Sequence, residues 1–324
     1  MTPLVFSLNP AVDVEWRVEE ILAGEKNELR SESRWPGGKG VNVARWLSWL
    51  RKPPRLFVTL GGATGRELAA GLRKEGIRTV AFRLREPTRV NVVVTPDRGE
   101  QLRFNPSWPH LDAAESRRLG QEICRLVLSA RTVVISGTLA FGAPAALYAR
   151  LVRAARRGGC RVFLDCDREP FALAVRERPF LVKPNQFELA QWAGTPLPDE
   201  ASEVEAAGRL SKATGGWVLV SRGEKGALLV HQELGVVHRA TVPASVPRNT
   251  VGAGDALLAG VVAAVEAGKD PEDWLRDGVA TGTAATTVAP GQLPSRKCWN
   301  EILRSVAVHP GTTSLSATDP RRDP

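Results

Sequence analysis

Short apolar runs rich in β-branched and aromatic residues alternate with helical patterns along most of this chain, and this alternation constrains its fold more than any other feature. Such a succession is typical of a mainly parallel sheet wrapped by helices. Several runs are almost wholly apolar, as expected for strands covered on both faces. The predicted strands are 4–8, 56–60, 79–84, 132–136, 161–165, 180–183 and 217–221, and the predicted helices are 41–50, 66–75, 113–129, 144–157, 187–193, 204–214, 256–267 and 271–287.

Two segments depart from this alternation. Residues 12–34 alternate polar and apolar side chains and carry many charges, and residues 89–105 have the pattern of a hairpin with a turn at 96–99. Strands of this kind fit a small, partly exposed sheet that projects from the main body and acts as a lid or a dimer surface. A solvated edge hairpin is the alternative for residues 89–105.

The C-terminal residues 310–324 are rich in Ser, Thr, Pro and charge and contain no core-forming pattern. We therefore expect a disordered tail there and one domain over residues 1–309. No apolar run is long enough to span a membrane, and the N-terminus lacks a secretion signal. The four cysteines have no metal-binding spacing. These features favour a cytoplasmic protein with reduced thiols.

The chain has 324 residues, of which 43% are hydrophobic and 24% charged, and its net charge is +9. A basic protein attracts anionic ligands, and it can also bind nucleic acid. However, the arginines are spread along the chain, and the tightest group, residues 153–157, has the pattern of one exposed helix face. Because there is no recognised nucleic-acid motif, we expect small anionic substrates rather than nucleic acid or a membrane as partners.

The most informative motif is residues 249–260, in which Gly252 and Gly254 lead into an apolar helix. Glycine permits a sharp turn, and the first N–H groups of a helix carry partial positive charge, so Gly252, Ala253 and Gly254 are predicted to hold a phosphate. Asp255 would repel a phosphate, but it suits a general base that takes a proton from an attacking hydroxyl. The alternative is an ordinary helix start that is capped by Thr250.

A second glycine-rich turn, residues 35–45, also leads into a helix. Gly38 allows close backbone approach, Lys39 adds a positive charge and Asn42 lies in the first turn, which suits a polyhydroxylated or phosphorylated ligand. The spacing is not that of a P-loop. Asp13 follows the first strand, where ligands of parallel sheets usually bind, and could accept hydrogen bonds from two sugar hydroxyls. A plain turn is the alternative at both places.

Two further motifs follow predicted strands. Asn185 and Glu188 are three residues apart on one helical face and could hold a hydrated Mg²⁺, although the same pair also forms the pattern of a capping box. The turn at 221–228 contains Ser221, Gly223 and Gly226, whose hydroxyl and backbone N–H groups could contact a nucleotide phosphate. A hairpin turn without a ligand is the alternative there.

Taken together and in this order, these motifs resemble the ribokinase-like (PfkB) family of sugar kinases, from about residue 4 to residue 287. Residues 37–42 resemble its N-terminal signature, residues 249–260 its C-terminal signature, and residues 185–188 its magnesium-associated motif. The resemblance implies a three-layer α/β/α fold with a mainly parallel central sheet and a small β-sheet lid.

Within the family, residues 9–13, Lys39, residues 88–91 and residues 183–185 resemble the phosphohexose kinase branch. That branch includes 1-phosphofructokinase, tagatose-6-phosphate kinase and the minor-type 6-phosphofructokinase. Lys39 resembles the 1-phosphofructokinase and tagatose-6-phosphate kinase types, and residues 61–65 resemble the 6-phosphofructokinase type. The motifs therefore do not decide which sugar phosphate is the substrate. The chain departs from the branch at residues 136–142, where two prolines are replaced, and at Asn249, which leaves a monovalent-cation site undetermined.

The resemblance implies ATP-dependent phosphorylation of a ketohexose phosphate at a primary hydroxyl, with Asp255 as general base and with Mg²⁺ held through Asn185 and Glu188. A kinase for an unphosphorylated sugar or nucleoside, and a catalytically silent sugar-phosphate-binding regulator, are the alternatives. A homodimer through the lid sheet is also implied. The sugar phosphate would be held by Asp13, Gly38, Lys39, Asn42, Arg89, Asn91 and Lys26, the nucleotide by Lys183, Asn185, Ser221, Gly223, Gly226 and Thr250, and the transferring phosphoryl group by Gly252, Ala253 and Gly254.

Overall fold

The structure, a computed structural model, describes residues 2–243 and 247–310. The strands are β1 Leu4–Ser7, β2 Ala11–Val18, β3 Ser31–Gly37, β4 Arg55–Gly61, β5 Arg78–Leu84, β6 Arg89–Pro96, β7 Leu102–Phe104, β8 Thr132–Ser136, β9 Arg161–Asp165, β10 Leu181–Val182, β11 Trp217–Ser221, β12 Ala227–His231, β13 Val236–Thr241 and β14 Ala307–Pro310. The helices are α1 Lys39–Trp49, α2 Gly62–Lys74, α3 Ala113–Leu126, α4 Leu147–Arg157, α5 Arg168–Val175, α6 Gln186–Ala193, α7 Glu200–Thr214, α8 Ala253–Glu266, α9 Pro271–Thr286 and α10 Arg296–Ser305, with short 3-10 turns η1 Val127–Ser129 and η2 Gly223–Lys225.

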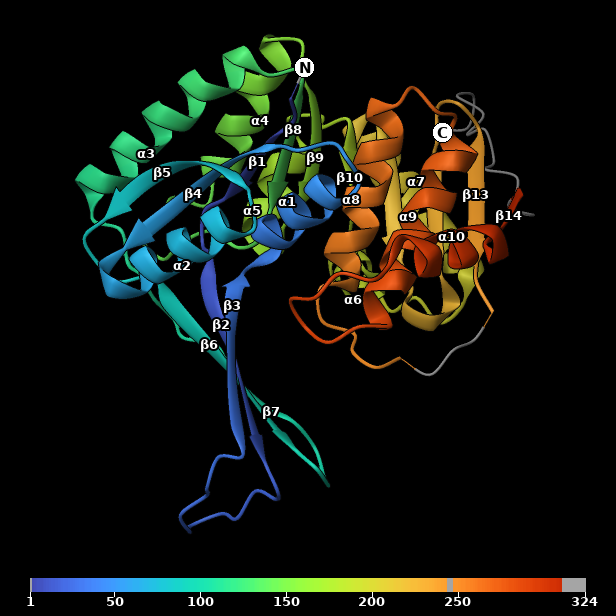
Figure 1. Cartoon of the computed structure of the whole chain (residues 1–324). Helices are drawn as coiled ribbons and strands as arrows, with labels where there is room; N and C mark the ends of the chain where they lie inside the picture. The colour runs from blue at the N-terminus through green and yellow to red at the C-terminus, as the bar shows by residue number, and fades with distance from the viewer. Residues whose placement is uncertain (1, 244–246, 311–324) are drawn as a thin grey trace.

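A 10-stranded sheet forms the middle layer, in the order β14-β13-β12-β11-β10-β9-β8-β1-β4-β5 (Figure 1). The strands from β11 to β5 pair in parallel, and β12, β13 and β14 add an antiparallel edge. One apolar core joins the sheet to α3, α4, α5 and α7, and a second joins its other face to α1, α2, α8 and α9. The predicted three-layer α/β/α arrangement is therefore confirmed, and the wholly buried β1 is covered on both faces as expected.

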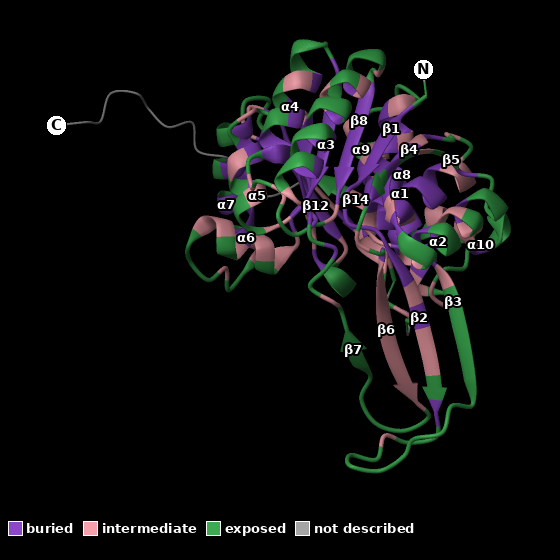
Figure 2. Cartoon of the chain, turned by 90° about the vertical axis from the view of Figure 1, so that its left-hand side faces the viewer, coloured by how far each residue is buried: buried purple, intermediate pink, exposed green. Residues whose placement is uncertain are grey.

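A separate 4-stranded sheet, in the order β3-β2-β6-β7, projects from the main body and is called the lid sheet below (Figure 1). β2 and β6 pair in parallel, and β6 and β7 form the predicted antiparallel hairpin with Val92 opposite Phe104. Its outer strands β3 and β7 are largely exposed, in contrast to the buried main sheet (Figure 2). The prediction of a small, partly exposed sheet is confirmed, while its action as a lid stays a prediction.

α5, α10, β13 and β14 were not predicted, and β12 was not among the predicted strands although the turn before it was identified. Pro170 lies in the first turn of α5 and disrupts a helical pattern, whereas the apolar residues Ile302 and Leu303 of α10 are only partly buried against the second core. β13 and β14 extend the antiparallel edge, where Pro310 is the last residue of β14 opposite His238. The rest of the expected tail, residues 311–324, lies outside the described residues. Among the helices that the structure describes, none is long and apolar enough to cross a bilayer.

Candidate active site

Helix α8 begins at a glycine rather than at a capping side chain. Gly252 is the N-cap residue with φ of 79°, a left-handed conformation that favours glycine, and no side chain caps the helix. The alternative that Thr250 caps α8 is therefore wrong. Because the first N–H groups of a helix have no partner within it, the amide of Gly254 is available to an anion, while the amide of Ala253 makes only a long hydrogen bond of 3.4 Å to the backbone oxygen of Thr250.

Asp255 lies in the first turn of α8 and is buried, with only 6% of its surface exposed. Its Oδ2 accepts a hydrogen bond of 2.8 Å from Asn42 Nδ2 in α1, so the two glycine-rich motifs meet here. Burial, followed by the negative charge of Asp165, raises the pKa of Asp255 to about 7, although Asn42, Lys39 and Lys183 act in the opposite direction. A carboxylate with a pKa near neutrality is suited to accept and release a proton.

Two lysines and a fully buried carboxylate lie close to Asp255. Lys39 Nζ is 3.1 Å from Asp165 Oδ1, and Lys183 Nζ is 3.3 Å from Asp165 Oδ2. Burial alone would raise the pKa of Asp165, but Lys183 and Lys39 outweigh it and hold this pKa below its ordinary value. Asp165 in turn is the main cause of a raised pKa at Lys39, which stays charged. A Cβ on Gly254 would lie 3.6 Å from Lys183 Nζ, so this amine faces the turn that precedes Asp255.

The residues predicted to hold the sugar gather where β1 ends and the lid sheet begins. Asn91 Nδ2 donates a 2.8 Å hydrogen bond to Asp13 Oδ1, and Arg89 Nη2 donates to the backbone oxygen of Asn9 at 3.0 Å. Burial raises the pKa of Asp13 and lowers that of Arg89, while their mutual attraction opposes both shifts. Three buried atoms, Arg89 Nε, Asn9 Oδ1 and Asn91 Oδ1, find no hydrogen-bond partner among the described residues. Such atoms fit a polar ligand, because buried polar groups are otherwise paired.

Glycines allow this end of the site to be compact. A Cβ on Gly37 would lie 2.0 Å from Asp13 Oδ2, so only glycine lets the carboxylate rest against β3. Gly38 has φ of 100° and a Cβ there would lie 3.0 Å from Pro10 Cα. The sequence motif therefore serves close packing at Gly37 as well as the turn at Gly38.

Asn185 and Glu188 form a complete capping box at the start of α6. Asn185 Oδ1 accepts from the Glu188 N–H at 2.8 Å, and Glu188 Oε2 accepts from the Asn185 N–H at 2.9 Å. The capping interpretation is confirmed, and a role toward a metal stays a prediction. Glu188 Oε1 lies 3.9 Å from Lys39 Nζ and thus faces the lysine pair. No group of three or more His, Cys, Asp or Glu side chains that could hold a metal is found in the described part of the chain.

A cavity of about 520 Å³ beside α8 is lined by four of the residues predicted to hold the nucleotide, Ser221, Gly223, Gly226 and Thr250, whereas Lys183 and Asn185 do not line it. Its polar wall contains Ser221, Gly223, Gly226, Thr250, Ala253 and Gly254, and its apolar wall contains Val242, Leu257 and Val279. A cavity with an apolar wall and backbone N–H groups at one end suits a nucleotide, whose base is flat and apolar and whose phosphates are anionic. A bridge between Asn185 and Ser221 places the start of α6 next to this cavity.

Lys26 is not brought to the other site residues. It lies in the segment between β2 and β3 at the far end of the lid sheet, where its side chain is 85% exposed and pairs with Glu28 at 3.2 Å (Figure 1). By contrast, the altered segment 136–142 does reach the site. Thr138 Oγ1 accepts a hydrogen bond of 3.1 Å from Asn9 Nδ2, and a Cβ on Gly137 would lie 3.6 Å from Lys39 Cβ.

Sequence reasoning did not select Asp165 and Arg45, which the structure places in contact with predicted site residues. Asp165 ends the apolar strand β9, and a lone acid at the carboxyl end of a parallel strand is a signal that could have found it. Arg45 lies one turn after Asn42 in α1 and donates to its side chain at 3.0 Å. Nothing in the sequence separates this arginine from the other arginines of exposed helix faces.

Comparison with known proteins agrees with this geometry. The model of the pfkB family of carbohydrate kinases matches residues 5–298, so the chain belongs to this family and is a sugar kinase. It is 30% identical over 302 residues to 1-phosphofructokinase of Bacillus subtilis (strain 168), covering 93% of this chain and 97% of that protein.

Two solved structures of phosphofructokinase-2 from Escherichia coli are similar in fold and sequence. The complex with fructose-6-phosphate superposes with a TM-score of 0.85 at 28% identity, covering 94% of this chain and 98% of that one. A tetrameric inhibited form of the same enzyme gives a TM-score of 0.86 at 29% identity, again over 94% and 98%. The ribokinase-like fold is thereby established from structure as well as from sequence.

Proposed function

We propose that this chain transfers the γ-phosphoryl group of ATP to a primary hydroxyl of a ketohexose phosphate, in the manner of a 1-phosphofructokinase or a tagatose-6-phosphate kinase. The observation that carries the proposal is the position of Asp255, a buried carboxylate in the first turn of α8, directly after the turn at Gly252–Gly254 and beside the cavity of about 520 Å³. A base at the end of an anion-binding turn is the arrangement that phosphoryl transfer to an alcohol needs.

In the proposed reaction, Asp255 takes the proton of the hydroxyl as the hydroxyl oxygen forms a bond to the γ-phosphorus of ATP. The bond between the γ-phosphorus and the bridging oxygen breaks, and ADP leaves. The N–H groups of Ala253 and Gly254 stabilise the charge on the transferring phosphoryl group. The positive charges of Lys39 and Lys183, which lie next to Asp165, contribute to the same stabilisation. Catalysis of this kind consists mainly of positioning and electrostatic stabilisation.

The donor set fits a Mg²⁺ ion that keeps most of its waters. Magnesium prefers oxygen ligands and is usually bound by few protein groups together with substrate phosphates. Glu188 Oε1 is not used by the capping box and faces Lys39, and Asn185 lies in the same turn beside the nucleotide cavity. These two residues would hold the ion through water, and the ion would supply charge neutralisation to the phosphates of ATP.

The phosphate that the substrate already carries is assigned to Arg89. This guanidinium is half-buried, and its Nε, which is itself buried, has no partner in the described part of the chain, so an anion would satisfy it. A site built around a half-buried cation with a free N–H disfavours a neutral sugar or a nucleoside, because neither brings the negative charge that would pair with it. Lys39 contacts Asp165 and faces Glu188, which favours a role toward the transferring phosphoryl group over one toward the sugar phosphate. The hydroxyls of the sugar would contact Asp13, Asn42, Asn91 and the backbone at Gly38.

A 6-phosphofructokinase is the second candidate, because residues 61–65 have that type of sequence and the similar Escherichia coli enzyme was solved with fructose-6-phosphate. The deciding experiment measures ADP release from ATP with fructose 1-phosphate, fructose 6-phosphate, tagatose 6-phosphate, fructose and adenosine as acceptors. We expect turnover with at least one ketohexose phosphate and much weaker turnover with fructose and adenosine. Preference for an unphosphorylated acceptor would contradict the proposal, and the best phosphate ester identifies the type of kinase.

The ionisation of Asp255 predicts a pH dependence. Since the base must be unprotonated to act and burial raises its pKa to about 7, kcat/KM should fall as the pH decreases below about 7 and level off above it. The measurement is a kcat/KM profile for the sugar phosphate over a buffered pH series, with a coupled assay that is shown not to limit the rate. A profile that is flat down to the ordinary pKa of an aspartate would contradict the assigned state of Asp255.

The proposal extends to a homodimer formed through the lid sheet and to a cytoplasmic location. Phe104 and Leu102 on β7 are 55% and 43% exposed, and the similar Escherichia coli enzyme has a tetrameric form. The four cysteines are free thiols, as in a reducing compartment. We expect a dimer in sedimentation velocity and a monomer after Phe104→Asp. A wild-type monomer, or a Phe104→Asp dimer, would contradict the use of the lid sheet as the interface.

A further inference from the structure

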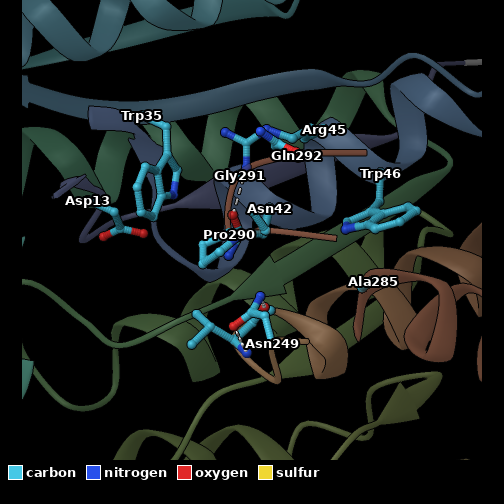
Figure 3. A pocket seen from close by; sticks show the side chains of 13 residues that line it. Asp13, Trp35, Asn42, Arg45, Trp46, Asn249, Ala285, Pro290, Gly291 and Gln292 are labelled. Carbon is cyan, nitrogen blue, oxygen red and sulfur yellow. Dashed lines mark hydrogen bonds between the residues drawn. The ribbon is translucent and has the colours of Figure 1, made fainter. Parts of the chain in front are cut away.

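Arg45 is a buried arginine in α1 that the proposed mechanism does not use. Only 5% of its surface is exposed, and its guanidinium grips Glu75 with two hydrogen bonds, from Nε at 2.8 Å and from Nη2 at 3.0 Å. Nη2 also donates to the backbone oxygen of Pro36 at 2.5 Å. The remaining arm, Nη1, donates to Asn42 Oδ1 at 3.0 Å. The guanidinium is thus fixed on three sides, and Figure 3 shows it beside Asn42 at the small pocket that Asp13 and Trp35 also line.

This contact determines which way the Asn42 amide faces. Arginine can only donate hydrogen bonds, so the amide oxygen of Asn42 must point toward Arg45. The amide nitrogen then points the other way, and it donates to Asp255 Oδ2 at 2.8 Å. If the amide rotated by about half a turn, its oxygen would face the carboxylate, and two acceptors would meet where one donor and one acceptor meet now.

The Asn42 amide also contacts the glycine-rich turn at Gly252. A Cβ on Gly252 would lie 3.5 Å from Asn42 Nδ2 and 3.9 Å from Asp255 Oδ2, so the Asn42 amide packs directly against the residue that starts α8. Asn42 and Arg45 are three residues apart and therefore lie on one face of α1, toward Asp255 and Glu75 respectively. The ion pair between Arg45 and Glu75, at the end of α2, thus fixes the orientation of the Asn42 amide that contacts Asp255.

We infer that Arg45 is a positioning residue, which holds the Asn42 amide in the one orientation that donates a hydrogen bond to Asp255. This inference rests on the proposed function, because it takes Asp255 to be the general base. Arg45 itself touches neither the nucleotide cavity nor the reacting atoms. Its effect passes through Asn42 and must therefore disappear when Asp255 can no longer act as a base.

The hydrogen bond from Asn42 also affects the pKa of Asp255. The charged groups that face Asp255 are Asp165 from β9, which raises its pKa, and Lys39 and Lys183, which lower it. The hydrogen bond from Asn42 stabilises the charged carboxylate and lowers the pKa as well. Loss of the orientation of Asn42 would therefore raise the pKa of Asp255, and the acidic limb of the kcat/KM–pH profile would move to higher pH.

The test compares Arg45→Met and Arg45→Lys with the matched control Arg34→Met. Arg34 grips Glu67 with the same two-bond geometry, at 2.8 and 3.0 Å, but contacts no site residue. Removal of a group that orients a functional side chain costs about ten- to hundredfold in activity in metal sites, and we expect a loss of that size in kcat for Arg45→Met, with KM for ATP nearly unchanged. Arg45→Lys can keep the ion pair to Glu75 but lacks the planar guanidinium that reaches Asn42. We therefore expect a decrease in kcat in this variant as well, even if Arg45→Met does not fold.

Arg45→Met made in the Asp255→Asn variant decides whether Arg45 acts through Asp255. We expect Arg45→Met to lower the residual rate by less than about twofold there, because coupled residues are not additive. An equal loss in both backgrounds, or a wild-type kcat/KM–pH profile in folded Arg45→Met and Arg45→Lys, would overturn the inference. Wild-type activity in Asp255→Asn alone would instead overturn the proposed function, so the two failures are distinguishable.

Discussion

Asp255→Asn is expected to lower kcat by between about a hundred- and ten-thousandfold, which is the usual contribution of a positioned base. Asparagine has nearly the same shape and can still contact Asn42, but it cannot take a proton from the attacking hydroxyl. Because the change affects the transition state more than substrate binding, KM for ATP and for the sugar phosphate should change little. The measurement is steady-state kinetics with the preferred ketohexose phosphate, at saturating ATP.

The control for this variant is Asp277→Asn. Asp277 is also a buried carboxylate, but it pairs with Lys269 at 2.6 Å within the α8–α9 region and lines none of the cavities described above. We expect nearly wild-type kcat in this variant. A comparable loss in both variants would mean that the removal of any buried carboxylate disturbs the fold, and wild-type turnover in Asp255→Asn would contradict its role as the base.

Arg89→Ala is expected to raise KM for the sugar phosphate by about two orders of magnitude, while KM for ATP stays nearly unchanged. The guanidinium is half-buried and its buried Nε lacks a partner among the described residues, so the phosphate of the substrate would form a charge-assisted hydrogen bond in a poorly solvated place. Loss of one partner from a buried, hydrogen-bonded charge pair typically costs that much in binding.

Arg34→Ala is the matched control for Arg89→Ala, since Arg34 lies on β3 of the same lid sheet and pairs with Glu67. It should leave both KM values close to those of the wild type. Equal increases of both KM values in Arg89→Ala would argue against a contact with the sugar phosphate. A similar increase in Arg34→Ala would indicate a general disturbance of the lid sheet.

Those parts of the fold that depend on local pattern were predictable from the sequence. The apolar runs at β1, β4, β8 and β9 are buried on both sides as expected, and their alternation with helices led to the three-layer fold. Other elements were missed for different reasons. α10 has apolar residues at helical spacing, but Trp299, Ile302 and Leu303 are only partly buried at the edge of the second core, and β14 is a short edge strand that ends in Pro310.

The site was predictable only where its residues lie close together in sequence. The turn at Gly252–Asp255 and the turn at Gly37–Asn42 each show a glycine-rich start to a helix, and the structure joins them through the hydrogen bond between Asn42 and Asp255. Asp165 is brought to Lys39 from 126 positions along the chain, and its place at the end of β9 is the only local signal that marks it. The pair Asn185 and Glu188 does form a local pattern, but this pattern has two interpretations, because it serves both a helix cap and a proposed metal contact.

The central claim is that Asp255 receives the proton of the attacking hydroxyl, and a crystal structure with the preferred ketohexose phosphate and a non-hydrolysable ATP analogue tests it most directly. The account predicts the free primary hydroxyl of the sugar at about 3 Å from the Asp255 carboxylate and in line with the γ-phosphorus, with the sugar's own phosphate at Arg89. A sugar bound with its phosphate toward Asp255, or with no hydroxyl within hydrogen-bond distance of that carboxylate, would contradict it.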